Sequence, residues 1–346
     1  MKYTIDTAYF RDCLKTLLDT PSPLGYYALG NPLLERYARE LGCAFSTDRR
    51  GAAYFTLEGQ DNSRTVQIAA HMDTLGFVVR AIDANGYIRV RNMGGINYHS
   101  AEGETVTVHT RDGRRYTGLL ACQSHSVHVF TDAKTMERDE NTMVVLLDEP
   151  VTSKADVNAL GIRHGDVISI EPRCEFTANG YIKSRFLDDK AGVAVCLSAI
   201  KYLRDNGLKP RYRTVFSFPY YEENGLGGNY VPEGVEEFLA LDIGLVGPEL
   251  DGSEYGVSIC PRDGVSSYDY DLTTRLIHLA EGAGCRYAVD VFFRYSTDAM
   301  KALQAGHNIK AGVYGMAVIC SHGRERTHIT AIENTANLTL AYLLEG

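Results

Sequence analysis

The chain has 346 residues, 45% of them hydrophobic and 23% charged, which suits a folded protein large enough for two domains. Its formal net charge of -9 argues against a nucleic-acid partner, because phosphate binding needs a basic surface. The first residues lack a basic segment followed by an apolar core, and no run approaches the roughly 18 apolar residues of a membrane helix. We therefore predict no signal peptide and no membrane span.

The 8 cysteines are scattered along the chain, and none forms a CxxC pair. In a chain of this length that pattern predicts free thiols in a reducing cytoplasm. It also argues against a zinc site built from cysteines, so any metal would have to be held by other side chains.

The first segment is predicted to be α/β. Apolar residues at helical spacing between 10 and 18 and between 33 and 41 predict two helices, which are ended by Pro21 and Gly42. The run 65–70 is the clearest strand of this segment, and His71 follows it directly.

The sequence pattern changes between about Leu75 and Lys183, where short β-rich runs are separated by turn signals such as Asn85-Gly86 and Asp112-Gly113. Short strands at regular spacing favour a small β-barrel or sandwich. Helical spacing returns between 193 and 203, and alternating strands and helices continue to the end of the chain. We predict an α/β catalytic domain formed by residues 1–74 and 184–346, interrupted by a β-barrel-like domain of residues 75–183.

Acidic and histidine residues fall at the ends of predicted strands or the start of a helix. His71 and the pair Glu222-Glu223 each follow an apolar strand directly, Asp188-Asp189 opens a helix, and Asp242 lies in another apolar run. Ligands of α/β sheets bind in the crevice where strand ends converge, so these groups could meet there. His328, near the C-terminus, is a further candidate.

This mixture of imidazoles and carboxylates suits Zn²⁺, Co²⁺ or Mn²⁺. Two neighbouring metal ions need a shared carboxylate, and Asp188 could supply it; the other ligands could come from His71, Asp242, Glu223 and His328. Glu222 is then left free to take a proton from a metal-activated water, as a general base. Each motif alone is more often a helix cap or a solvated turn, and only their ordered co-occurrence favours a site.

The ordered set resembles the dinuclear metallopeptidases of the glutamyl aminopeptidase and tetrahedral (TET) aminopeptidase family. The resemblance covers nearly the whole chain and rests on the segments 69–77, 186–192, 221–228, 241–242, 296–299 and 326–328. It implies a phosphorylase/hydrolase-like three-layer α/β domain with an inserted β-barrel-like dimerisation domain. It also implies peptide substrates, two divalent metal ions (Zn²⁺ above all, with Co²⁺ or Mn²⁺ as alternatives) and a homo-oligomer built from dimers.

Carried over by position, the resemblance makes His71 and Asp242 terminal ligands of one metal, Glu223 and His328 ligands of the other, and Asp188 the bridge. Glu222 becomes the general base, and Asp73 the carboxylate that orients the His71 ring, while Thr297-Asp298 lie nearby.

Several positions depart from the family pattern. The last motif reads Glu325-Arg326-Thr327-His328, and His322 offers a second candidate for its histidine. Such departures suggest a divergent subgroup, nearer to the deblocking aminopeptidases. Two other functions stay open: a two-metal amidohydrolase or deacylase acting on small N-acyl compounds, and a non-catalytic assembly protein that retains the fold.

Overall fold

The computed structural model describes all residues from Met1 to Gly346 and divides them into two compact units. The first unit consists of residues 1–73 and 173–346, and the second of residues 74–172. The second unit is thus an insertion in the first. Its start lies one residue from the predicted boundary, but its end comes earlier than the predicted residue 183.

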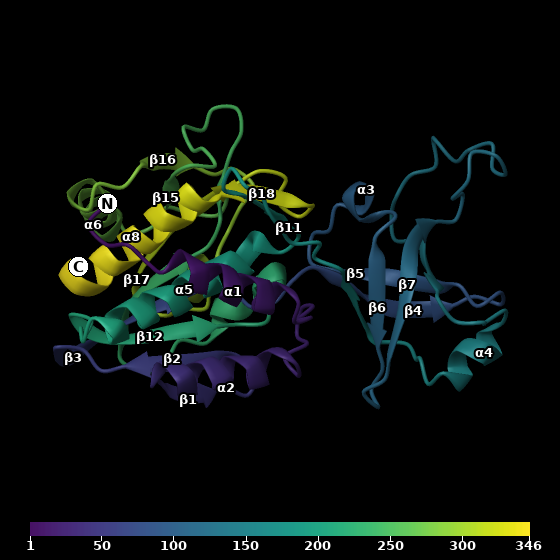
Figure 1. Ribbon diagram of the computed structural model, residues 1–346, viewed down its shortest axis with the longest axis horizontal. Coiled ribbons are helices and arrows are strands. Elements are labelled where there is room, and N and C mark those ends of the chain that lie inside the picture. Colours follow the sequence, from purple (N-terminus) through teal and green to yellow (C-terminus); the bar gives the residue numbers. More distant parts are fainter. The chain divides into compact units, whose positions relative to one another are not determined.

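The first unit is built on a sheet of 9 strands. Along the sheet the order is β1 (Ala44–Thr47), β2 (Ala53–Leu57), β12 (Tyr212–Phe218), β3 (Asp61–Ala69), β13 (Val235–Leu241), β17 (Lys310–Val318), β15 (Val257–Arg262) and β16 (Tyr287–Val291), with β14 (Gly244–Leu245) beside β17. Strands β12, β3, β13 and β17 are mutually parallel neighbours. Their carboxyl ends therefore meet at one edge of the sheet (Figure 1).

Helices cover both faces of this sheet, which makes three layers. The helices of this unit are α1 (Thr7–Leu18), α2 (Gly30–Leu41), α5 (Leu187–Asp205), α6 (Tyr270–Gly282), α7 (Asp298–Gln304) and α8 (Ile329–Glu345). Helices α5, α6 and α8 contact one another or β17 on one face, and α1 packs on α5. A Cβ at Gly312 in β17 would lie 2.8 Å from Leu239 and 3.3 Å from Leu272 of α6, so α6 packs closely on that face.

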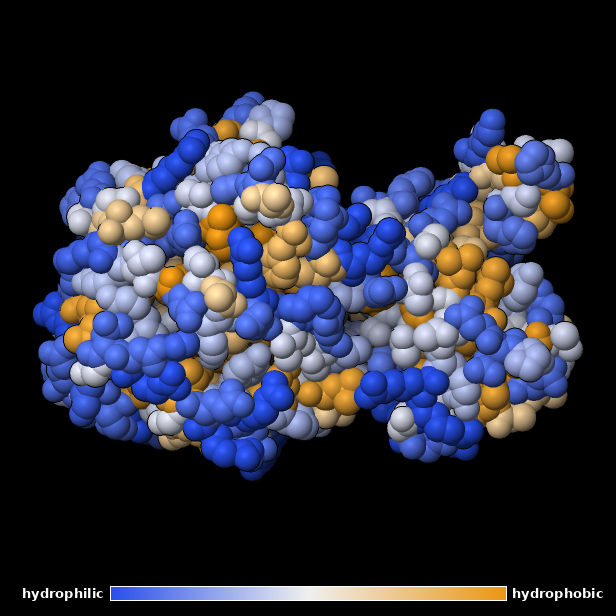
Figure 2. All heavy atoms as spheres, in the orientation of Figure 1, coloured by the Kyte–Doolittle hydropathy of each residue, from blue (hydrophilic) through white to orange (hydrophobic).

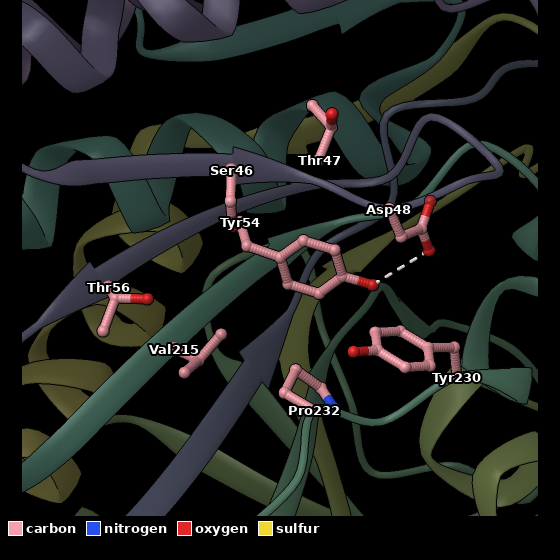
Figure 3. A pocket seen from close by; sticks show the side chains of 8 residues that line it. All are labelled: Ser46, Thr47, Asp48, Tyr54, Thr56, Val215, Tyr230 and Pro232. Atoms are coloured by element: carbon pink, nitrogen blue, oxygen red, sulfur yellow. Dashed lines mark hydrogen bonds between the residues drawn. The ribbon is translucent and has the colours of Figure 1, made fainter.

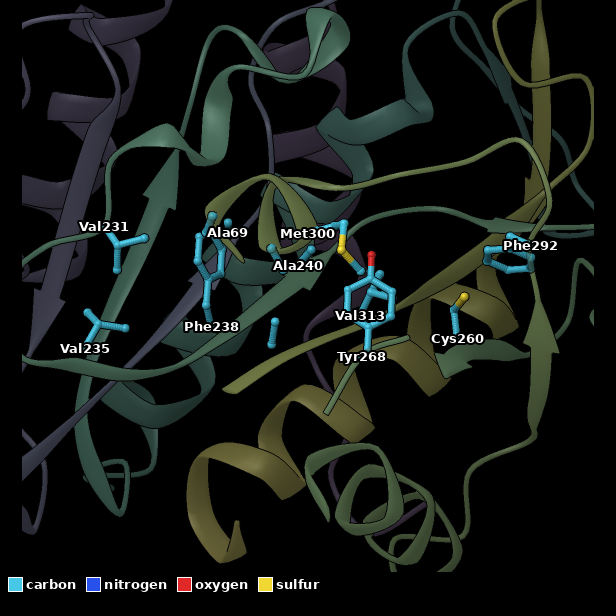
Figure 4. Close-up of a cluster of buried hydrophobic side chains, with 13 residues drawn as sticks. Ala69, Val231, Val235, Phe238, Ala240, Cys260, Tyr268, Phe292, Met300 and Val313 are labelled. Carbon is cyan, nitrogen blue, oxygen red and sulfur yellow. The ribbon is translucent and has the colours of Figure 1, made fainter. Parts of the chain in front are cut away.

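The other face carries the core that α7 closes. Phe238 and Ala240 of β13 point to this side, together with Val313 of β17, and they pack with Met300 of α7 (Figure 4). Alternate residues of β13 thus point to opposite faces, as the period of a strand requires. Both faces are buried, which explains why the central strands read as continuous apolar runs.

The inserted unit is a closed barrel of short strands, as predicted. Around the barrel the order is β4 (Gly76–Ile82), β5 (Ile88–Met93), β8 (Met143–Leu147), β7 (Arg115–Cys122), β6 (Thr105–His109) and β9 (Val167–Ile170). Two short helices accompany it, α3 (Tyr98–Ala101) and α4 (Lys154–Ala159). Closure removes the exposed edges that an open sheet of this size would have.

The predicted end of the insertion is wrong for a topological reason. Residues 173–183 contain β10 (Glu175–Phe176) and most of β11 (Tyr181–Ser184), and β11 pairs with β18 (Glu325–His328) of the first unit. None of the helices is both long and apolar enough to cross a membrane. On the face shown in Figure 2, hydrophobic side chains are interspersed among hydrophilic ones.

Candidate metal centre

Three of the predicted side chains follow neighbouring parallel strands. His71 comes two residues after β3, Glu222 four residues after β12, and Asp242 directly after β13. Because β12, β3 and β13 are adjacent, the sheet brings these side chains to one edge. One nitrogen or oxygen from each of the three lies within 4.8 Å of the other two.

Asp188 enters the cluster from the start of α5. Its Oδ1 lies 2.9 Å from Nε2 of His71, and its Oδ2 lies 3.8 Å from Nε2 of His322. The two oxygens of one carboxylate thus face two different imidazoles, which is the arrangement that a bridging ligand needs. Glu223 lies on the same side as His322, with Oε2 3.6 Å from its Nε2. His71, Asp188 and Glu223 form a second group whose ligand atoms lie within 4.8 Å of one another.

The structure does not bring His328 into this cluster, and the prediction that named it is wrong. Nε2 of His328 lies 2.8 Å from the carbonyl oxygen of Asn179, and Nδ1 accepts from the backbone N–H of Thr330 as the cap of α8. Its ring packs against those of Tyr181 and Tyr255. Both nitrogens are therefore engaged elsewhere, and His322 takes the position that was expected of His328.

Asp73 lies beside His71, but its carboxylate is closer to the backbone of the glutamate pair than to the imidazole ring. Nδ1 of His71 lies 3.0 Å from the carbonyl oxygen of Asp73 and 3.6 Å from its Oδ1. The same carboxylate accepts the backbone N–H groups of Glu222 and Glu223, at 3.2 and 3.1 Å. Asp73 thus links the histidine to the glutamate pair. Asp189, joined to Asp188 by a cis peptide bond, accepts the backbone N–H of His71.

The cluster holds more buried carboxylates than cationic groups, and the pKa values reflect this. Burial and the charge of Asp188 raise the pKa of Asp242 to about 7. Burial, with neighbouring carboxylates, also raises the pKa values of Glu222 and Glu223 well above their usual range. Burial opposes protonation of His71, but the bonds to Asp188 and Asp73 outweigh it and raise the pKa of the imidazole. A positive charge is therefore favoured among these side chains.

These residues fit a pair of divalent cations. The donor atoms are imidazole nitrogens and carboxylate oxygens, which suit Zn²⁺, Co²⁺ and Mn²⁺, and they converge from five separate segments. Divalent ions among them would keep the carboxylates ionised despite their burial. His71, Asp188, Glu222, Glu223, Asp242 and His322 could supply the ligands or contact bound water.

The cluster forms one wall of a cleft of about 300 Å³. Arg294, Tyr295, Ser296 and Lys301 line other parts of it. Sequence reasoning did not single out Arg294 and Lys301, because isolated basic residues carry no pattern. The only available signal was that both lie close in the sequence to the predicted motif at Ser296.

Asp298 is buried beneath the glutamate loop at the start of α7. A Cβ at Gly227 would lie 2.4 Å from its Oδ1, so only glycine allows the loop to approach this closely. Burial raises the pKa of Asp298 to about 8, and the nearby charges of Asp73 and Asp242 contribute in the same direction. The sequence predicted that Thr297-Asp298 lie near the site, and Asp298 does so by packing under this loop.

Comparison with known proteins decides the family. The profile of the M42 glutamyl aminopeptidases matches residues 51–338. The chain belongs to this family. It is accordingly an aminopeptidase, and the fold class and resemblance predicted from the sequence are confirmed.

Individual relatives agree with this assignment. The chain is 39% identical to YhfE of Bacillus subtilis (strain 168) over 334 residues, which cover 96% of both chains. It is 28% identical to the glutamyl aminopeptidase of Lactococcus lactis subsp. cremoris over 222 residues, 63% of this chain and 61% of that one. The solved structure of Pyrococcus horikoshii TET1 peptidase matches with a TM-score of 0.85 and 23% identity, covering 97% of this chain and 100% of the other. That last likeness shows the fold.

Proposed function

We propose that this M42 aminopeptidase uses two divalent metal ions and Glu222 to remove N-terminal residues from peptides. The observation that carries the proposal is the position of Asp188 between two imidazoles. Its Oδ1 faces His71 at 2.9 Å and its Oδ2 faces His322 at 3.8 Å. When bound, the ions would polarise the scissile carbonyl and lower the pKa of the attacking water.

The residues of this chain would do the remaining work. Glu222 faces the cleft with Oε2 3.8 Å from Nε2 of His71, and burial raises the pKa of its carboxyl well above the usual range, which favours its taking up a proton. It takes a proton from the water as the oxygen–carbon bond forms, and gives it to the leaving nitrogen as the carbon–nitrogen bond breaks. Asp73, through both glutamate N–H groups, keeps this carboxylate in place during the transfer.

Two basic side chains at the other side of the cleft, Arg294 and Lys301, favour substrates with an acidic N-terminal residue. Arg294 is exposed and makes no ion pair, and Lys301 lies over Gly225, where a Cβ would be 2.9 Å from its Cε. A carboxylate side chain directed away from the metal ligands would meet these cations. The relative from Lactococcus lactis is named a glutamyl aminopeptidase, which supports the same preference.

The oligomer and the location remain predictions of the sequence. A homo-oligomer built from dimers is supported by the Pyrococcus horikoshii TET1 peptidase, which can assemble into a tetrahedron or an octahedral shell. A cytoplasmic location is supported by the 8 free cysteines.

Aminoacyl anilides with added Zn²⁺ or Co²⁺ test the function, with N-acetylated anilides and a chelator as controls. We expect free-amine substrates to be cleaved, the acetylated ones to be spared and the chelator to abolish turnover. Glu222→Gln should keep its metal content and lose about 10²-fold or more in kcat. Cleavage of only the acetylated substrates would contradict the aminopeptidase assignment, and full activity of Glu222→Gln would contradict the assigned base.

The acidic preference has its own test. Glutamyl and glutaminyl anilides differ only in the charge of the side chain, so wild-type enzyme should favour the former. Arg294→Gln with Lys301→Gln should remove that difference and leave cleavage of alanyl anilide unchanged. A wild-type enzyme that cleaves alanyl anilide but not glutamyl anilide would refute the preference alone.

A further inference from the structure

The loop that carries Glu222 is closed on itself. The backbone N–H of Leu226 donates to the carbonyl of Tyr221 at 2.9 Å, and that of Gly225 donates to the carbonyl of Glu222 at 2.6 Å. The segment 221–226 is therefore a compact loop whose two ends lie side by side. Contacts that hold those ends therefore fix the direction in which the side chain of Glu222 projects from the loop.

A single arginine contacts both ends. The guanidinium of Arg50 lies 4.3 Å from the ring centre of Tyr221, and its Nη1 donates to the carbonyl of Leu226 at 2.8 Å. Arg50 is 176 residues away from Leu226 in the sequence, in the turn between β1 and β2. It makes no ion pair with a carboxylate, so its positive charge is directed to an aromatic face and a carbonyl oxygen.

The turn that carries Arg50 is itself rigid. Oδ1 of Asp48 accepts the backbone N–H groups of Arg50 and Ala52, at 2.8 and 2.9 Å. Oδ2 of Asp48 accepts the hydroxyl of Tyr54 at 3.2 Å (Figure 3). Gly51 has a φ of +86° and packs against the ring of Tyr27, so no other residue fits the turn without strain. Arg50 therefore extends from a fixed base.

The loop is thus held from two directions. Asp73 accepts the N–H groups of Glu222 and Glu223 from beside the metal ligands, and Arg50 grips the ends of the loop from the β1–β2 turn. Arg50 is not among the residues that line the cleft, and its contacts to the loop are those with Tyr221 and Leu226.

We propose that Arg50 is a positioning residue for Glu222, and this inference rests on the proposed role of Glu222 as the base. Loss of this contact lets the loop ends move and misplaces the Glu222 carboxylate against the attacking water. Four of the ligands, His71, Asp188, Asp242 and His322, lie outside the loop and stay in place, and Glu223, the ligand inside it, keeps its backbone bond to Asp73. Displacements of about 1 Å at a reacting group can lower rates by about 10²-fold, whereas binding of the substrate need not change.

Arg50→Ala tests the proposal, with Arg49→Ala as the matched control. Arg49 is the exposed neighbour in the same turn and makes no ion pair. For Arg50→Ala we expect kcat to fall about 10- to 100-fold, with KM, metal content and the thermal midpoint close to those of Arg49→Ala. Arg50→Lys, which keeps the charge over the ring but has a different donor geometry, should recover part of the loss.

A double-mutant cycle separates positioning from general support of the fold. Tyr221→Leu removes the ring under Arg50, so combining it with Arg50→Ala should lower kcat little further than the worse single variant, while Tyr221→Phe, which keeps the ring, should stay near wild type. Wild-type kcat in Arg50→Ala, additive losses in the cycle, or a fall in metal content in step with kcat would each overturn the proposal. If wild type is active and Glu222→Gln is not, such a result defeats this inference alone.

Discussion

Replacing His322 or His328 separately should decide which histidine binds metal. His322 is placed beside Asp188 and Glu223, whereas both ring nitrogens of His328 already have partners outside the cluster. Four-ligand zinc sites contribute about 10–16 kcal/mol of binding free energy, so one ligand is worth roughly 3 kcal/mol. His322→Ala should therefore weaken the affinity of one metal by about 10²-fold.

His328→Ala should behave differently, because its ring caps α8 through the N–H of Thr330 and bonds to Asn179. Loss of such a cap costs about 1 kcal/mol of folding stability. Titration of chelator-treated protein with Zn²⁺ in a calorimeter, followed by denaturant unfolding, measures both quantities. A fall in metal affinity for His328→Ala with none for His322→Ala would refute the reasoning.

Two further predictions concern stability. Glu237 is buried against Arg275 and Arg64, and these guanidinium groups hold the pKa of its carboxyl low despite burial. Glu237→Gln should therefore lower the free energy of unfolding by about 3 kcal/mol, measured in urea at pH 7. The control Glu236→Gln, at the exposed neighbour, should lower it by less than about 1 kcal/mol. Because the folded pKa of Glu237 is depressed, its contribution is present above the unfolded value and is lost as pH falls below it; a difference between the two variants that persists undiminished at pH 3 would contradict this. Burial lowers the pKa of His109 in the barrel to about 4, so the barrel should lose up to about 3 kcal/mol between pH 6.5 and pH 4, and His109→Gln, followed by circular dichroism, should lose less over the same interval.

The sequence predicted the sheet edge because strand ends are local features. His71 and Glu222 each follow an apolar strand closely, and parallel strands of one sheet must end at the same edge. Which histidine completes the cluster depends instead on a turn. His322 lies between β17 and β18 with a φ of +61°, in a short connection that no periodic pattern describes. His328 followed the family motif more closely, yet it ends a strand that points it elsewhere.

The end of the insertion was missed for a related reason. Residues 173–183 have the same short β-rich texture as the barrel, so composition assigns them to it. Their unit is decided by the pairing of Tyr181 with His328 and of Ser184 with Glu325, across more than a hundred intervening residues. The same holds for Asp73, because the two-residue spacing from His71 predicts proximity but does not say which oxygen faces the ring.

Two buried carboxylates, at opposite ends of one strand, show that the sequence does not reveal the partners of a buried charge. Glu237, near the start of β13, has a lowered pKa because Arg275 and Tyr342 donate to it. Asp242, directly after the same strand, has a pKa raised to about 7 by burial and by Asp188. Glu237 precedes an apolar run and Asp242 directly follows it, and neither position shows in the sequence which groups will face it. Only the partners differ, since the chain compensates one end of the strand with its own cations and surrounds the other with further carboxylates. The uncompensated end is therefore the one that favours a cation from outside the chain.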